Sequence, residues 1–312
     1  MATEAIKKIY RGVSTYLQYW RGIPIALYRT IQDIPFYIRN PYDEDITVTF
    51  EKDYNDTSTA WNYHSVNVYY KNSPDPSRAW TLLGTTTKKS TEYPTINIPA
   101  HSTIYFGGEP LDGDGKPSNE YGWGYRTPTP GTSGYVWNTI KGAPIVGGNI
   151  LSLLRRNDFV KNHTINEYSF YNLFRGTTLI DAGELYLPST TLAKGCYREM
   201  FLGNSSLAVA PKLPATTLAT ECYREMFRGN SSLVNAPALP APILTDYCYY
   251  HMFYNSGVQN VTCLAEDRSA DSCTTGWLYG VPRGGVLTKK AGVYWPINNT
   301  GGIPAGWTSI DV

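Results

Sequence analysis

The strongest constraint on this chain is a short segment that recurs at a fixed interval in its C-terminal half. Cys196, Cys222 and Cys248 lie 26 residues apart, and each is followed at the same distance by Met-Phe. A degenerate earlier copy begins at Ser169, so that four copies are expected. One such unit cannot bury its apolar side chains alone, and tandem copies therefore stack on one another. The sequence predicts a solenoid in this half of the chain.

Within each repeat, the apolar residues have the spacing of a short amphipathic helix. In the third copy they occupy positions i, i+3, i+4, i+7 and i+8, which place them on one helical face. These residues are Ala219, Cys222, Tyr223, Met226 and Phe227. Gly229-Asn230 supplies a left-handed helix stop, and Pro237 and Pro240 require extended chain beyond it. Each repeat is therefore predicted to contain a helix, a turn and a short strand.

The repeat also resembles a known family. Met-Phe-x-Gly-Asn-Ser-Ser-Leu, followed by Ala-Pro-x-Leu-Pro-Ala, is similar to the BspA-type leucine-rich repeat of gut Bacteroidales surface proteins and of the crAss-like phages that infect these bacteria. The resemblance covers about residues 165–261, with Asn204 and Asn230 where the family usually has Cys. It implies an α/β leucine-rich-repeat solenoid at 147–261. Residues 262–312 resemble the closing segment of the same proteins and are predicted to form a C-terminal cap.

Residues 44–146 are predicted to form an antiparallel β-sandwich. The segments 46–50, 65–70, 95–98 and 102–106 are strand candidates separated by Pro, Gly and Asn clusters. The pattern around Trp80 resembles the immunoglobulin-like sandwich that commonly precedes these repeats. Gly147-Gly148 and the apolar residues after it resemble the junction into the first repeat, which places the domain boundary near residue 147.

Residues 1–43 contain a duplicated element, because Ile9-Tyr-Arg-Gly-Val13 is echoed by Tyr19-Trp-Arg-Gly-Ile23. Strand, Arg-Gly turn, strand units of this kind resemble the N-terminal attachment segments of tailed-phage virion proteins. The resemblance implies a β-hairpin anchor, with candidate anchoring residues Arg11, Gly12, Trp20, Arg21 and Gly22. The alternative is that two edge hairpins extend the sandwich.

Composition favours binding over catalysis. The 27 Lys and Arg residues against 26 Asp and Glu leave a net charge of +1, which gives no field to concentrate nucleic acid. There is no apolar stretch of about 18 residues to cross a membrane. The 26 Tyr and 8 Trp beside only 17% charged residues favour β-rich, interface-forming domains. The four histidines are scattered without metal-ligand spacing, so no catalytic residues, cofactor or metal site are expected.

One loop and one cysteine pair leave alternatives open. Tyr121, Trp123 and Tyr125 interleave with glycine and could present flat rings to a sugar, or could instead cover a sheet edge or a subunit contact. Cys263 and Cys273 are close enough in sequence to form a disulfide, although free thiols are favoured for a protein assembled inside the cell.

These features predict a non-enzymatic phage virion protein, a head or tail fibre or decoration protein. Its N-terminus would dock on a capsid or tail protein, and its solenoid would face a host glycan or protein. Self-association as a homotrimer, with a dimer second, is expected from resemblance to phage fibres. A bacterial surface adhesin is the alternative, and a polysaccharide-cleaving enzyme a third class. The N-terminus has no apolar signal region, which favours cytoplasmic assembly into a surface-exposed virion position over export.

Overall fold

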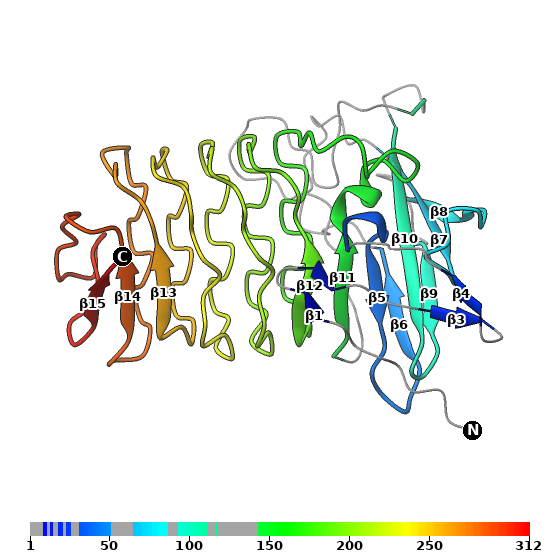
Figure 1. Cartoon of the computed structure of the whole chain (residues 1–312), viewed down its shortest axis with the longest axis horizontal. Helices are drawn as coiled ribbons and strands as arrows, with labels where there is room; N and C mark the ends of the chain where they lie inside the picture. The colour runs from blue at the N-terminus through cyan, green and yellow to red at the C-terminus, as the bar shows by residue number, and fades with distance from the viewer. Residues whose placement is uncertain are drawn as a thin grey trace.

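The computed structural model is elongated, with a β-sheet at one end and a row of stacked coils that leads to the C-terminus (Figure 1). It describes residues 31–50, 65–86, 93–111, 116–117 and 143–312, together with four short strands within residues 9–25. These four strands form two antiparallel pairs that flank the two Arg-Gly dipeptides. They are β1 (Ile9–Tyr10) with β2 (Val13–Ser14), and β3 (Gln18–Trp20) with β4 (Ile23–Ile25).

A six-stranded sheet forms the broad end of the molecule. Its strands, in sheet order, are β12 (Asp181–Tyr186), β11 (Ile145–Asn149), β5 (Tyr37–Arg39), β10 (Thr103–Pro110), β7 (Val66–Lys71) and β8 (Thr81–Thr86). Four of the five pairings are antiparallel, but β11 and β12 run parallel. The prediction of a purely antiparallel sandwich is therefore wrong, because the sheet is mixed. It also joins β5 of the predicted anchor segment to β12 of the repeat segment.

A second layer of two strands closes the core of this end. β6 (Ile46–Thr49) pairs antiparallel with β9 (Thr95–Ile98), and alternate residues of β6 are buried. The rings of Phe50 and Phe106 lie 5.3 Å apart beneath it. Phe36 contacts both Phe106 and Phe174, at ring separations of 6.3 and 5.9 Å. Since Phe174 belongs to the first repeat, the core continues from the sheet into the coil stack.

The repeats contain no helix, which overturns the predicted α/β solenoid. Among the described residues, only η1 (Ile31–Asp33) and η2 (Ile150–Leu153) are helical, and both are short 3-10 turns. Within the third copy, Glu221, Glu225 and Gly229 have φ values of 59°, 55° and 76°. An α-helix requires φ near −63° at every residue, so a left-handed residue at every fourth position cannot belong to one.

Each repeat instead forms a run of tight turns whose amide groups alternate between two kinds of partner. Cys222 and Met226 donate back within the run, to the carbonyls of Ala219 and Tyr223, at 3.2 and 3.1 Å. The alternate residues Tyr223, Glu225 and Phe227 donate forward to the next coil. Tyr223 bonds to the carbonyl of Cys248 at 3.2 Å. A four-residue period places nearly the same positions inward as a 3.6-residue period, which explains why the burial pattern mimics a helix.

Five such turn segments follow one another along the stack. They are residues 168–176, 195–203, 221–229, 247–255 and 272–280, each with left-handed residues at its first, fifth and ninth positions. On the other wall, the coils are bridged in parallel, and the row ends in β13 (Asn260–Cys263), β14 (Val286–Lys289) and β15 (Thr308–Asp311). The fifth turn segment and two of these strands lie within residues 262–312, where a cap was predicted.

Aromatic columns fill the stack. The rings of Phe201, Phe227 and Phe253 stack at successive separations of 5.5 and 5.7 Å, with interplanar angles of 5° and 4°. The repeated cysteines and methionines are fully buried beside them, as the periodicity predicts. Asn204 is also fully buried, and its amide donates to the carbonyl of Phe174 at 2.5 Å, so this residue links two coils.

Neither of the two 3-10 turns, the helical elements among the described residues, could span a membrane.

The left-handed turn conformation and an α-helix predict opposite effects of glycine, relative to alanine, on the free energy of unfolding. Glu225→Gly and Glu225→Ala both remove the carboxylate, so their difference reports the backbone alone. At a φ of 55° glycine is the more favourable residue, and Glu225→Gly should unfold with a free energy about 1 kcal/mol higher than Glu225→Ala. A helix would favour alanine by about the same amount. Urea unfolding of the two variants decides between these conformations. The pair Arg224→Gly and Arg224→Ala is the control, and there alanine should be favoured.

Candidate functional site

The residues that the sequence singles out lie mostly outside the described part of the chain. This holds for the candidate ligand loop, Tyr121, Trp123 and Tyr125, and for the anchoring candidates Arg11, Gly12, Arg21 and Gly22. Trp20 is placed by its backbone in β3, opposite Ile23 of β4. The search for a site therefore turns to the described surface.

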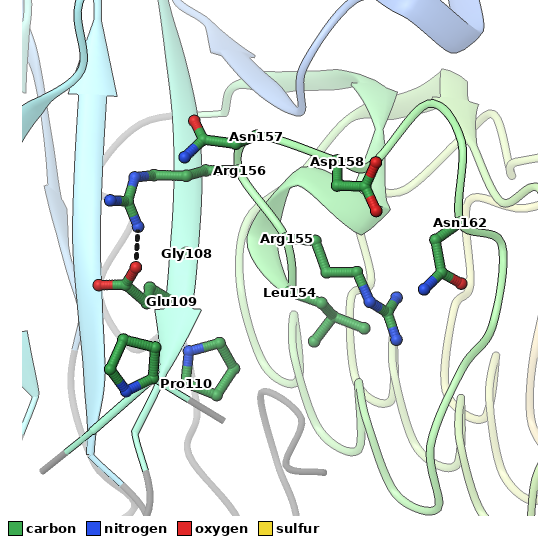
Figure 2. A pocket seen from close by; sticks show the side chains of 10 residues that line it. Gly108, Glu109, Pro110, Leu154, Arg155, Arg156, Asn157, Asp158 and Asn162 are labelled. Atoms are coloured by element: carbon green, nitrogen blue, oxygen red, sulfur yellow. Dashed lines mark hydrogen bonds and ion pairs between the residues drawn. The ribbon is translucent and has the colours of Figure 1, made fainter. Parts of the chain in front are cut away.

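A small polar cleft lies between the end of β10 and residues 154–162, which precede the first turn segment (Figure 2). Arg156 donates to Glu109 at 2.5 Å, and its guanidinium lies 3.8 Å from the ring centre of Tyr69. Burial alone would raise the pKa of Glu109, but hydrogen bonds from Arg156, Asn67 and Tyr69 hold it below its ordinary value. The cleft has a volume of about 190 Å³, whereas small-molecule sites typically exceed about 300 Å³. We interpret it as a joint that fixes the coil stack to β10.

The more extended candidate is the outer face of the turn segments. Here the term outer face denotes the side chains that point away from the aromatic columns: Arg198, Glu199, Glu221, Arg224, Glu225, Arg228, Tyr250, His251, Tyr254 and Tyr279. In the second and third copies these residues form a ladder of ion pairs. Glu221 binds Arg198 of the preceding coil and Arg224 of its own, both at 2.9 Å. Glu225 lies 3.4 Å from Arg224 and 2.7 Å from Arg228.

Partial burial makes this ladder electrostatically significant. Burial alone would raise the pKa of Glu225, but the hydrogen bond and charge of Arg228, together with Arg224, hold it below its ordinary value. Burial likewise opposes the charge of Arg198, whose pKa is nevertheless raised by Glu199 and Glu221. Each charge of the ladder is therefore compensated by a neighbour, which leaves little to attract a charged ligand, and removal of one partner would leave the other partly buried and unpaired.

The outer face changes character in the fourth and fifth coils. Tyr250, His251 and Tyr254 stand where the third copy has Arg224, Glu225 and Arg228. Each arginine of the third copy lies over a tyrosine of the fourth, with Arg224 4.8 Å from the ring centre of Tyr250 and Arg228 5.0 Å from that of Tyr254. Tyr254 then stacks on Tyr279 at 4.9 Å. The face thus passes from paired charges to stacked rings.

The part of this aromatic surface that belongs to the fourth copy could have been found in the sequence. The fourth copy, Cys248-Tyr-Tyr-His-Met-Phe-Tyr, keeps the buried Tyr, Met and Phe of the repeat but exchanges every charged outer position for an aromatic ring. His251 of this copy lies between two tyrosines, with ring centres 3.9 and 4.8 Å away, and burial lowers its pKa, which the charge of Glu225 partly opposes.

The five cysteines are free and buried, and this includes Cys263 and Cys273. Burial raises the pKa of Cys196, Cys248 and Cys263 to about 12, so these thiols stay protonated at neutral pH. Within the residues described, no cluster of three His, Cys, Asp or Glu side chains could hold a metal ion.

No protein-family model, curated protein or solved structure matches this chain. Its function is therefore inferred from its own residues.

Thiol counting tests the cysteine assignment. With Ellman's reagent, the native protein should show almost no fast reaction, because the buried thiols are protonated and shielded. After unfolding in guanidinium without reductant, all five thiols should react. A disulfide between Cys263 and Cys273 would leave only three of the five thiols to react, and that count would contradict the structure.

The ladder also predicts a pH dependence. The folded-state pKa of Glu225 is below its ordinary value of 4.5, so the carboxylate stabilises the fold above that pH, and the contribution is lost as the pH falls through the folded-state pKa. Glu225→Gln should therefore be less stable than the parent at pH 6, by roughly 2 kcal/mol. The gap should narrow as the pH falls towards 3. Because the charge of Glu225 also acts on the pKa of His251, the same comparison is made in a His251→Gln background, where that coupling is absent. A constant gap between pH 6 and 3 would rule out the ion pair as its source.

Proposed function

We propose that this chain is a non-enzymatic adhesion protein of a phage virion, held on the particle by its N-terminal segment and contacting the host surface through the outer face of its coil stack. The proposal rests chiefly on one observation. In the fourth coil, the outer positions that carry mutually paired charges in the third copy are occupied by Tyr250, His251 and Tyr254, while the buried positions keep their repeat pattern. Tyr279 of the fifth coil stacks on Tyr254.

This exchange is hard to explain by stability alone. The inner columns, which supply the burial, are the same in the third and fourth copies, so the fold does not require the outer residue types to change. Tyr279 is exposed, and Tyr250 and Tyr254 are half-buried. Tyrosines at a surface are typical of recognition sites, because each ring supplies a large, stiff contact area and a polar hydroxyl. The change therefore favours a role in binding.

The scaffold beneath the tyrosines suits a rigid display. Tyr254 and Tyr279 are each followed by a left-handed residue, and the amide of Asn255 donates to the carbonyl of Tyr279 at 2.8 Å. The backbone on which the rings stand is thus bonded from one coil to the next. Sites on such elements are held more accurately than sites on loops, which limits the entropy lost on binding.

The virion location is supported by resemblance. The duplicated Arg-Gly hairpins resemble phage attachment segments, and the repeats resemble those of crAss-like phages and their hosts. The proposed partners are a capsid or tail protein and two further molecules of the same chain in a homotrimer. Because β5 lies inside the six-stranded sheet, the part proposed to dock is restricted to residues 1–30.

Charge reversal in the full-length chain tests this location. Antibody against the chain should label intact phage particles from the producing culture. Particles assembled with the Arg11→Glu, Arg21→Glu variant should carry at least tenfold less label, because both docking turns change sign. The soluble variant should melt at the same temperature as the parent.

Arg78→Glu, at an exposed arginine outside the N-terminal segment, is the matched control and should label normally. Parent particles without label would refute the virion location. Label on the bacterial surface of uninfected cells would favour the adhesin alternative.

A further inference from the structure

The column of side chains that crosses the outer face ends in an open aromatic ring. Arg228, Tyr254 and Tyr279 come from three successive coils, and Tyr254 is covered by Arg228 on one side and by Tyr279 on the other. The two tyrosine rings are nearly parallel, with an interplanar angle of 16°. Tyr279 is 44% exposed. One face of this ring is therefore supported by a partner while the other is available.

A polar group stands next to the ring pair. Asn255 is exposed and has a φ of 53°, and its side-chain oxygen lies directly over Gly280, where a β-carbon would come within 2.0 Å of it. The side-chain carboxamide of Asn255 makes no hydrogen bond to any residue that the structure describes. An asparagine amide has two donors and an acceptor. Here they are positioned by the backbone without being used by the fold.

We infer that Tyr254, Asn255 and Tyr279, here called the tyrosine platform, bind a neutral pyranose ring of a host glycan, an inference that rests on the proposed adhesive function. The C–H face of a pyranose packs on the open face of Tyr279, and the Asn255 amide donates to one ring hydroxyl and accepts from its neighbour. Apolar surface with a few convergent polar groups is the usual composition of a small-ligand site.

The surroundings of the platform favour a neutral sugar over other ligands. Arg228 pairs with Glu225 at 2.7 Å, so the cation that lies over Tyr254 is already compensated and offers little to an acidic sugar. A protein partner requires about 800 Å² of complementary surface on each side. One ring face and one amide supply much less than that, but they match the size of a single sugar residue.

Native affinity electrophoresis of the full-length chain tests the inference. Soluble neutral polysaccharides, namely dextran, laminarin, mannan and galactan, are cast into separate gels. At least one should retard the parent protein. Tyr279→Ala should weaken that retardation roughly tenfold, the effect of losing one aromatic stacking partner. Asn255→Gly should weaken it several-fold, and it introduces the residue found at the equivalent positions Gly203 and Gly229, so folding should be preserved.

The matched control is Tyr294→Ala, at a tyrosine that is 78% exposed and outside the platform, which should migrate as the parent does. The inference is overturned if no polysaccharide retards the parent, or if both platform variants are retarded as strongly as the parent.

A second readout separates this inference from the proposed function. If particles carrying Tyr279→Ala lose adsorption to the host while no polysaccharide retards the parent, the adhesive function is supported and the neutral-sugar ligand is refuted. If polysaccharide binding depends on the platform but the chain is never found on virions, the sugar ligand is supported and the virion location is refuted.

Discussion

The hydrogen bonds that run from each coil to the next are the interaction on which the rest of the structure depends. Half of the amides in a turn segment close turns within it, and the other half donate to the following coil, as Tyr223 does to Cys248 and Phe227 to Met252. A helix would use all of its amides internally and leave neighbours to be joined by side chains alone. Here the backbone itself sets the register between coils.

This register places equivalent side chains above one another on both walls. Inside the stack, it produces the phenylalanine column and the buried cysteines and methionines. Outside, it lets Arg198 reach Glu221 of the next coil and Arg228 lie over Tyr254. A change in one copy of the repeat therefore alters one position in a surface column without disturbing the core beneath it. The fourth copy is such a change.

The sequence predicts burial in this protein better than conformation. Cys222 and Met226 are buried as expected, because a four-residue turn period and a helical period agree over two turns. The left-handed backbone conformation could not be predicted from the sequence, because Glu221 and Glu225 occupy positions where a glycine would have indicated it. The parallel pairing of β11 with β12 joins segments more than 30 residues apart and depends on tertiary context.

The candidate site was partly visible in the sequence. The aromatic outer positions of the fourth copy can be read directly from the repeat alignment. The fifth coil cannot, because its spacing shortens to 25 residues between Cys248 and Cys273, and Trp277 replaces the repeated methionine. Tyr279 was therefore not aligned with Tyr254, and the platform that they form required the structure.

The coil stack also behaves as a ruler. Each turn segment bonds only to its two neighbours, so duplication or loss of one copy would leave the six-stranded sheet and the tyrosine-bearing coils intact. Coils joined by backbone hydrogen bonds are about 4.8 Å apart. The distance between the end that holds the sheet and the end that carries the rings is thus set in increments of one coil, and related chains could reach receptors at different heights above a cell surface by changing the number of copies alone.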